Sequence, residues 1–201
     1  YSITYFDYFD TVTTIIGYEK KEEDFNKRVI YIENLLKEYH RLYDIYDSYV
    51  NINNLYTLNQ EVGNEVVVDQ KIIDLLNYAI DMYNQTSGMM NIAMGSVLKL
   101  WHDEREYASY HPNLEGKLPL MSDLEEAAKH TNILDIVIDD ERNTVLLKDK
   151  LMRLDVGAIA KGYATEEIAK KLQSLGVSSY MLNVGGNIRL IGSKANGEKW
   201  K

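Results

Sequence analysis

The sequence predicts an α+β fold in which a mainly antiparallel sheet has helices packed on its faces. The spacing of apolar residues changes several times along the chain between two, as in strands, and three to four, as in amphipathic helices. Short apolar segments also occur in pairs around turn-forming residues, at 134–138 with 144–147 and at 180–184 with 188–191. Such pairs are typical of antiparallel strands. Because no repeat, low-complexity tract or linker divides the chain, we expect one domain over residues 1–201.

The first segments predict a strand, a long helix and a loop. Residues 2–16 alternate polar with apolar or β-branched side chains and stop at Gly17, which predicts one strand. From Glu22 to Tyr43 the apolar residues lie three or four apart, so we expect an amphipathic helix with a charged outer face. Residues 44–64 are rich in Asn and Asp and weakly periodic, which predicts a loop with one short turn.

The middle of the chain predicts three more helical segments. Asp69 is a suitable N-cap for a helix that ends at Gly88. A short helical patch follows over 93–101, and the polar residues 102–119 read as an excursion. Ser122–Glu125 has the pattern of a capping box and predicts the start of the next helix.

The last third predicts a short strand over 151–155 and a helix that starts near Ile159 and ends before Gly176. The strands 180–184 and 188–191 then follow, separated by Gly185 and Gly186.

Charge and composition exclude several functional classes. With 22 basic and 31 acidic residues the net charge is −9, and no basic run is present, which argues against binding nucleic acid. The 45% hydrophobic content is typical of a globular protein. The absence of cysteine excludes disulfides, thiolate metal sites and cysteine nucleophiles from this chain. No apolar stretch is long enough to predict a membrane-spanning helix.

The segment Asp155–Tyr163 is the strongest candidate for a binding site. A predicted strand ends in a carboxylate and turns through small residues into a helix, whose first N–H groups favour an anion. Lys161 lies in the first turn, where its ammonium could meet a phosphate. The segment matches neither a Walker A loop nor a GxGxxG fingerprint. A tightly packed strand–helix junction with a solvated lysine explains it equally well.

Two further segments have both a functional and a structural explanation. Met89 and Met90, between two helices, could pack on a flat ligand ring, although filling the core is the more frequent role of methionine. The glycine pair in Asn183–Asn187 permits close backbone approach, and a hairpin turn explains it as well. The four histidines lack metal-site spacing and read as surface residues.

Taken together, these segments resemble the FAD:protein FMN transferases, the ApbE-like flavin transferases. The resemblance covers most of the chain, in order. Its most specific part is Asp155–Ala164, which is similar to the family signature D-[LV]-G-x-[IV]-A-K-G-Y-A. The other matching segments are Phe9-Asp10-Thr11, Leu42–Asp47 with Leu58-Asn59, Gly88–Ile92 with Leu100-Trp101, and Asn183–Asn187.

The resemblance implies a T-fold-like domain in an enzyme that cleaves FAD with Mg²⁺ and attaches FMN to a Thr or Ser of an acceptor protein. It implies that the backbone carbonyl of Ala158 is a Mg²⁺ ligand. Among the carboxylates of the chain, Asp155 is the best candidate to accept the proton of the acceptor hydroxyl. The residues expected to line the FAD site are Phe9, Tyr46, Met89, Met90, Asn91, Asp155 and Lys161.

The same resemblance implies a location and a partner. We expect a protein of the periplasm or cell surface, anchored by lipid on a cysteine upstream of residue 1, whose acceptor is a subunit of a membrane redox complex or another flavinylated protein. The family has Asp where this chain has Asn91, and its remaining metal ligands lie in a segment expected beyond residue 201. Two alternatives stay open: an FAD pyrophosphatase that yields FMN and AMP, and a non-catalytic flavin-binding module.

Overall fold

The computed structural model describes all of residues 1–201, which form two compact units. The first unit combines residues 1–41 with residues 157–201, and the second consists of residues 42–156. The expected class is confirmed, since helices accompany two sheets whose strands are all antiparallel. That residues 1–201 act as one domain stays a prediction.

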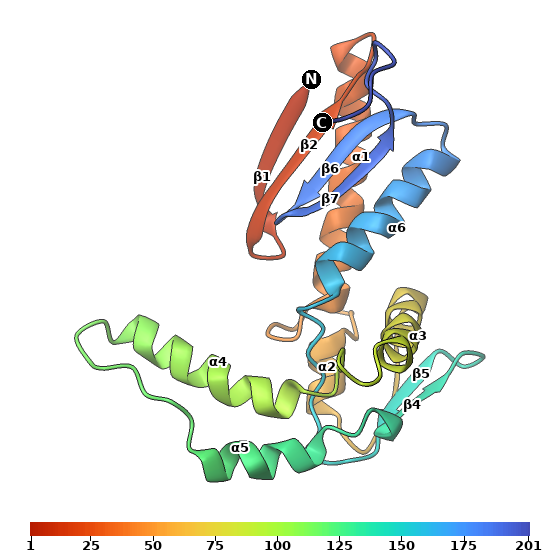
Figure 1. Ribbon diagram of the computed structural model, residues 1–201. Helices are drawn as coiled ribbons and strands as arrows, with labels where there is room; N and C mark the ends of the chain where they lie inside the picture. The colour runs from red at the N-terminus through yellow and green to blue at the C-terminus, as the bar shows by residue number, and fades with distance from the viewer. The chain divides into compact units, whose positions relative to one another are not determined.

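The first unit contains a four-stranded sheet in which the N-terminal hairpin pairs with the C-terminal one (Figure 1). The strand order is β1-β2-β6-β7, so strands from opposite ends of the chain meet in the middle of the sheet. The strands are β1 (Ser2–Tyr8), β2 (Thr11–Gly17), β6 (Ser179–Val184) and β7 (Asn187–Gly192).

The single strand expected over residues 2–16 is wrong, because the chain reverses at Phe9 and Asp10. Both residues have positive φ, 55° and 50°, as the two central residues of a tight hairpin turn require. Asparagine and glycine usually signal this turn, and a phenylalanine rarely adopts the left-handed conformation. The N–H of Phe9 donates to Nδ1 of His40 at 3.2 Å, which helps to hold the turn.

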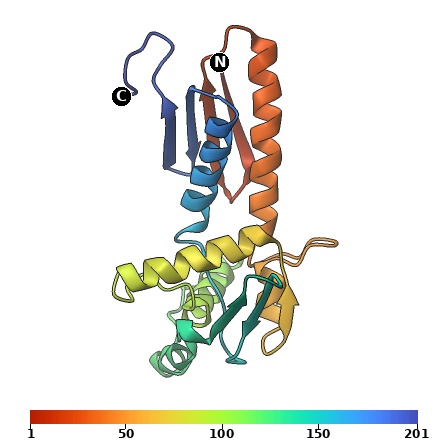
Figure 2. The same ribbon diagram turned by 90° about the vertical axis from the view of Figure 1, so that its right-hand side faces the viewer.

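Two helices cover one face of this sheet, α1 (Glu22–Tyr43) and α6 (Ala160–Ser174) (Figure 2). Ile15 of β2 lies opposite Leu182 of β6, and both side chains are buried. The ring of Phe25 on α1 stacks on that of Tyr180, with the centroids 6.2 Å apart. The predicted periodicities of the strand and the helix therefore place their apolar faces against each other.

The second unit is mostly helical and carries a small sheet of order β3-β5-β4. Its core consists of aliphatic side chains from the helices and from β5, such as Ile72, Leu76 and Val145, which are fully buried. Its elements are α2 (Leu55–Gln60), β3 (Glu65–Val67), α3 (Gln70–Gln85), α4 (Gly95–Tyr110), α5 (Met121–Ala127), β4 (Ile136–Asp139) and β5 (Thr144–Leu147).

Three boundaries in the second unit differ from those expected. The loop predicted over 44–64 contains α2, which starts with a capping box at Asn54. The helical patch predicted over 93–101 is the start of the longer α4, which has one buried residue, Gly95, and therefore almost no apolar periodicity. The capping box predicted at Ser122 is wrong, because Leu120 is the N-cap and the Ser122 hydroxyl donates to Asp123 instead.

The predicted cap of α3 is confirmed, since Asp69 accepts the N–H of Lys71 at 2.8 Å. None of the helices combines the length and the hydrophobicity needed to cross a membrane.

Candidate functional site

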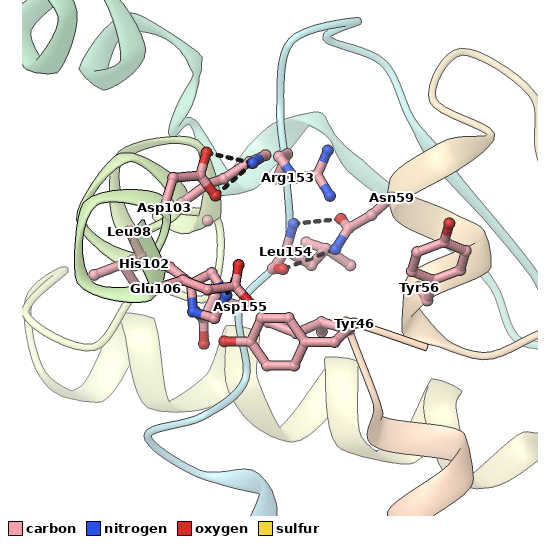
Figure 3. A pocket seen from close by; sticks show the side chains of 13 residues that line it. Tyr46, Tyr56, Asn59, Leu98, His102, Asp103, Glu106, Arg153, Leu154 and Asp155 are labelled. Atoms are coloured by element: carbon pink, nitrogen blue, oxygen red, sulfur yellow. Dashed lines mark hydrogen bonds and ion pairs between the residues drawn. The ribbon is translucent and has the colours of Figure 1, made fainter. Parts of the chain in front are cut away.

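The second unit contains a pocket of about 200 Å³ (Figure 3). This is enough space for one aromatic ring system rather than for a whole dinucleotide. The lining comes from the segment after α1, from α2, from α4 and from the segment after β5. The lining residues are Ile45, Tyr46, Tyr56, Asn59, Gly95, Leu98, Lys99, His102, Asp103, Glu106, Arg153, Leu154 and Asp155.

Asp155 reaches the pocket at the end of an extended segment, Arg153–Asp155. The strand predicted here belongs to neither sheet; a single parallel bridge joins Met94 to Arg153. The N–H of Asp155 donates to the carbonyl of Ile92 at 2.8 Å. The backbone that carries the predicted catalytic carboxylate is therefore hydrogen-bonded to the residues just before α4.

Helix α4 supplies one wall through side chains spaced four residues apart. Leu98, His102 and Glu106 line the pocket because this spacing places them on one face of the helix. Sequence reasoning missed this wall, since residues 102–119 were expected to be an excursion. The spacing of Leu98, His102 and Glu106 was the available signal.

Two aromatic rings lie against each other in the pocket. The Tyr46 ring stacks on the His102 imidazole, with centroids 4.7 Å apart and an interplanar angle of 25°. Nδ1 of His102 lies 2.9 Å from Arg105, and Nε2 lies 3.7 Å from Glu106. Because Tyr46 is 51% exposed, its ring can also contact a bound aromatic group.

The pocket has more acidic than basic groups. Asp103 is paired with Lys99 at 2.7 and 2.5 Å. Glu106 and Asp155 lie on the same pocket as the Tyr46 ring, as Figure 3 shows. Carboxylates accept hydrogen bonds from hydroxyl and amino donors, so this pocket suits a ring or sugar that carries donors better than a bare phosphate.

The predicted residues of the Met89–Asn91 segment do not line this pocket. The Met89 side chain is 88% exposed, so it does not fill the core. The Asn91 amide donates to the carbonyl of Thr131 at 2.9 Å and accepts the N–H of Ala93 at 2.9 Å. A carboxylate here could accept but not donate, which gives Asn91 a structural use. The expected FAD contacts of these residues stay predictions.

A second polar pair lies close in sequence to Thr131. Nδ1 of His130 is 2.7 Å from a carboxylate oxygen of Asp149. Burial raises the pKa of Asp149, but the N–H of Leu151 and the His130 ring outweigh it and hold this pKa below its usual value. The pair lies outside the pocket lining and joins the short 3-10 helix Ala128–His130 to the segment after β5.

In the first unit, three predicted segments meet at one end of the sheet. The turn at Gly185 is so close to β2 that an added Cβ would lie 2.5 Å from Oγ1 of Thr11. A Cβ on Gly162, in the first turn of α6, would lie 3.1 Å from Oδ1 of Asn187. The β1–β2 turn, the glycine turn and the start of α6 therefore lie together. The order of these motifs in the sequence gives no indication of this proximity.

The start of α6 retains the features that favour an anion. Its N-cap, Ile159, makes no side-chain capping bond, and no acidic residue lies in its first turn. Lys161 stands in that turn and is partly exposed. The two features together suit a phosphate, and the predicted contacts of Phe9, Ala158 and Lys161 with FAD or metal stay predictions.

The side chains of residues 1–201 do not form a complete magnesium site. No group of three His, Asp or Glu side chains lies close enough together to hold a metal ion. The carboxylate of Asp155 and the carbonyl of Ala158 are hard oxygen donors of the type that Mg²⁺ prefers, but an octahedral ion needs six ligands. We therefore assign no reaction step to a metal.

The fold defines a class of protein with known structures. The flavin transferase ApbE from Vibrio cholerae matches all of this chain with a TM-score of 0.81 and 23% identity, over 62% of its own chain. The ApbE protein from Thermotoga maritima matches 98% of this chain with a TM-score of 0.80 and 24% identity, over 60% of its own chain.

The sequence comparison identifies the family. The profile of the ApbE family matches residues 9–201, and the chain belongs to that family. An FAD:protein FMN transferase from Haemophilus influenzae is 25% identical over 173 residues, which are 85% of this chain and 48% of the relative. One from Treponema pallidum is 31% identical over 146 residues, which are 70% and 38%. The chain thus spans about half the length of the curated relatives that it matches, or less.

Proposed function

We propose that the whole protein transfers FMN from FAD to a Thr or Ser hydroxyl of an acceptor protein, in a reaction that depends on Mg²⁺. Membership of the ApbE family and relatives named FAD:protein FMN transferase support this proposal. The observation that carries it furthest is the pocket in which the Asp155 carboxylate and the stacked Tyr46 ring lie together. A ring-binding surface and a proton acceptor are the two parts that the reaction needs at the flavin nucleotide.

In the proposed reaction the acceptor oxygen attacks the phosphorus of the FMN half of FAD. A phosphoester bond forms, and the bond from this phosphorus to the bridging pyrophosphate oxygen breaks. AMP leaves with that oxygen, and the proton of the attacking hydroxyl passes to the Asp155 carboxylate. Tyr46 would hold a ring of FAD by stacking. Lys161 and the start of α6 would bind pyrophosphate oxygens.

The direct test is covalent labelling of an acceptor. The whole protein is incubated with FAD, Mg²⁺ and an acceptor that carries a flavinylation motif, and flavin fluorescence is read on the acceptor after denaturing electrophoresis. We expect a fluorescent acceptor band, and its loss on adding EDTA. Absence of the band with an acceptor that another transferase labels would refute the proposal.

Substitution of Asp155 tests its assigned role. Asp155→Asn should lower the rate of transfer by at least about a hundredfold, because general-base catalysis contributes this much or more. Asp81→Asn is the matched control, since Asp81 is an exposed carboxylate of α3 that does not line the pocket. Equal rates for the Asp155 variant and the wild type would exclude Asp155 as the base.

Chromatography of the same mixtures without acceptor separates the alternatives. Release of AMP and free FMN would identify an FAD pyrophosphatase, since water then replaces the hydroxyl. Tight binding of FAD without release of AMP, both with and without acceptor, would identify a flavin-binding module.

We also propose that the protein works at the cell surface or in the periplasm, anchored by lipid, and that its acceptor is a subunit of a membrane redox complex. This rests on the resemblance described above. Protease added to intact cells, or to cells with a permeabilised outer membrane, should degrade the protein while a cytoplasmic marker survives.

A further inference from the structure

The segment that carries Asp155 is hydrogen-bonded along both of its edges. On one edge, the N–H of Gly95 donates to the Arg153 carbonyl at 3.1 Å, and the N–H of Asp155 donates to Ile92. On the other edge, the Leu154 N–H donates to Oδ1 of Asn59 at 2.7 Å. Nδ2 of Asn59 donates back to the Leu154 carbonyl at 3.0 Å. One side-chain amide thus takes the place of a neighbouring strand.

This arrangement determines which side chains face the pocket. In an extended segment the backbone groups of alternate residues point to opposite edges, and alternate side chains point to opposite faces. Leu154 is 1% exposed, whereas Arg153 and Asp155 are both partly exposed, so the side chains of Arg153 and Asp155 share the face away from the core. A slip by one residue would exchange the two faces and remove the carboxylate from the pocket.

The Asn59 amide is well suited to fix this register. Asn59 is 5% exposed, so water cannot replace its bonds to Leu154. It stands in the last turn of α2, the short helix held at its start by the Asn54 capping box. A side-chain amide both donates and accepts along one edge in a fixed geometry at any pH, whereas a carboxyl of the same size does so only when it is protonated.

We propose that Asn59 is a positioning residue of this site. By closing the second edge of the Arg153–Asp155 segment, it aims the Asp155 carboxylate at the bound substrate. The expected effect of Asn59 on catalysis rests on the proposed function. Its effect on the position of Asp155 does not depend on that function. Asn59 lines the same pocket, but in this scheme it acts through the Arg153–Asp155 segment and not on the reacting atoms.

The test compares Asn59→Leu and Asn59→Asp with the wild type in the whole protein. Asn59→Leu removes both bonds and should lower the turnover number of FMN transfer by about tenfold to a hundredfold, since small displacements of catalytic groups have effects of this size. The dissociation constant for FAD, from flavin fluorescence, should change by less than about threefold, because Tyr46 and Lys161 keep their positions. Val145→Ala, buried in β5 and outside the pocket lining, controls for lost stability.

Asn59→Asp adds a pH signature that instability alone would not produce. A protonated carboxyl donates and accepts as the amide does, whereas an ionised one repels the Leu154 carbonyl. Transfer by this variant, relative to the wild type at the same pH, should therefore recover as the pH is lowered through the pKa of the introduced carboxyl. Asn59→Leu should show no such recovery. A constant ratio at all pH values would overturn the proposal.

The carboxyl ¹³C resonance of Asp155 provides a readout that needs no turnover. Its chemical shift, measured at one fixed pH, should change in Asn59→Leu and stay as in the wild type in Val145→Ala. An unchanged chemical shift in Asn59→Leu would refute the positioning role even if the protein proved to have another activity. Absence of transfer by the wild type, with the expected change in this resonance, would refute the proposed function and leave the positioning role supported.

Discussion

Gly95 is the first residue of α4, and we expect that even the methyl side chain of alanine at this position would disturb the site. A Cβ there would lie 2.5 Å from the Arg153 carbonyl oxygen, 2.7 Å from its carbon and 2.9 Å from the carbonyl carbon of Leu154. A carbon–oxygen contact needs about 3.3 Å, so in Gly95→Ala the backbone would have to shift by about 0.8 Å. All three atoms belong to the backbone, so no side-chain rotation can relieve the overlap.

The expected magnitude combines three contributions. Overpacking costs about 1–3 kcal/mol. The hydrogen bond from Gly95 to Arg153 contributes about 1 kcal/mol when it is lost. Replacing glycine by alanine in a helix stabilises it by at most about 1 kcal/mol, and by less at the first residue. Gly95→Ala should therefore lower the free energy of unfolding by about 2 kcal/mol.

The assay is urea unfolding of the wild type, Gly95→Ala and Gly116→Ala, followed by far-ultraviolet circular dichroism and Trp fluorescence. Gly116 is the matched control, because the nearest atom to its added Cβ is 3.9 Å away, on Ala108. Its substitution should change the free energy of unfolding by less than about 0.5 kcal/mol. If Gly95→Ala were as stable as the wild type, the close approach of α4 to the Arg153–Asp155 segment would be refuted.

Three further predictions concern the two units separately. Gly192→Ala should destabilise the first unit by more than about 3 kcal/mol in urea unfolding, because the added Cβ would lie 1.9 Å from the Ser178 carbonyl oxygen and the residue has φ +63°. The control Gly176→Ala has φ +78° but no atom within 4 Å of the added Cβ, so it should cost only about 1 kcal/mol. Equal losses of stability in the two variants would contradict this reasoning. Since the folded state lowers the pKa of Asp149, the pair with His130 should stabilise the protein above the unfolded pKa of about 3.9, and this contribution should vanish as the pH falls through the lower folded pKa. Unfolding curves of wild type and Asp149→Asn should differ at neutral pH and converge in acid, and curves that stay parallel would exclude the effect. Burial first, and then Glu33, raises the pKa of Tyr5 and of Tyr8 to about 12, so the stability linked to these hydroxyls is complete below a pH of about 10 and is lost as the pH rises through 12. The hydroxyls donate to the Glu33 carboxylate at 3.3 and 3.0 Å, so Glu33→Gln should lower both pKa values in an ultraviolet titration. Unchanged pKa values would show that these contacts are absent.

The elements with a strong local signal could be predicted from the sequence. Helices α1, α3 and α6 have apolar residues at helical spacing, and the hairpin of β6 and β7 is marked by its glycine pair. Where the local signal was absent or misleading, prediction failed. Phe9 and Asp10 form a tight turn without the residues that usually mark one, and α4 continues through polar residues because one face supports the pocket rather than the core.

Residue types at fixed spacing were enough to predict that Asp155 lies at a strand-like end, followed by small residues that turn into a helix with Lys161 in its first turn. The motif over Asp155–Ala164 was also enough to predict the family. These features are local, because they depend on residue types at fixed spacing along one stretch of chain.

Only the tertiary structure showed which residues share the pocket with Asp155. Asn59 bonds to Leu154, 95 residues further along the chain, and His102 stacks on Tyr46 from another helix. No periodicity connects such positions, since hydrogen bonds and ring contacts between distant segments depend on how the helices pack. The sequence therefore predicts Asp155 as the candidate carboxylate, and the packing of α2 and α4 determines which residues surround it.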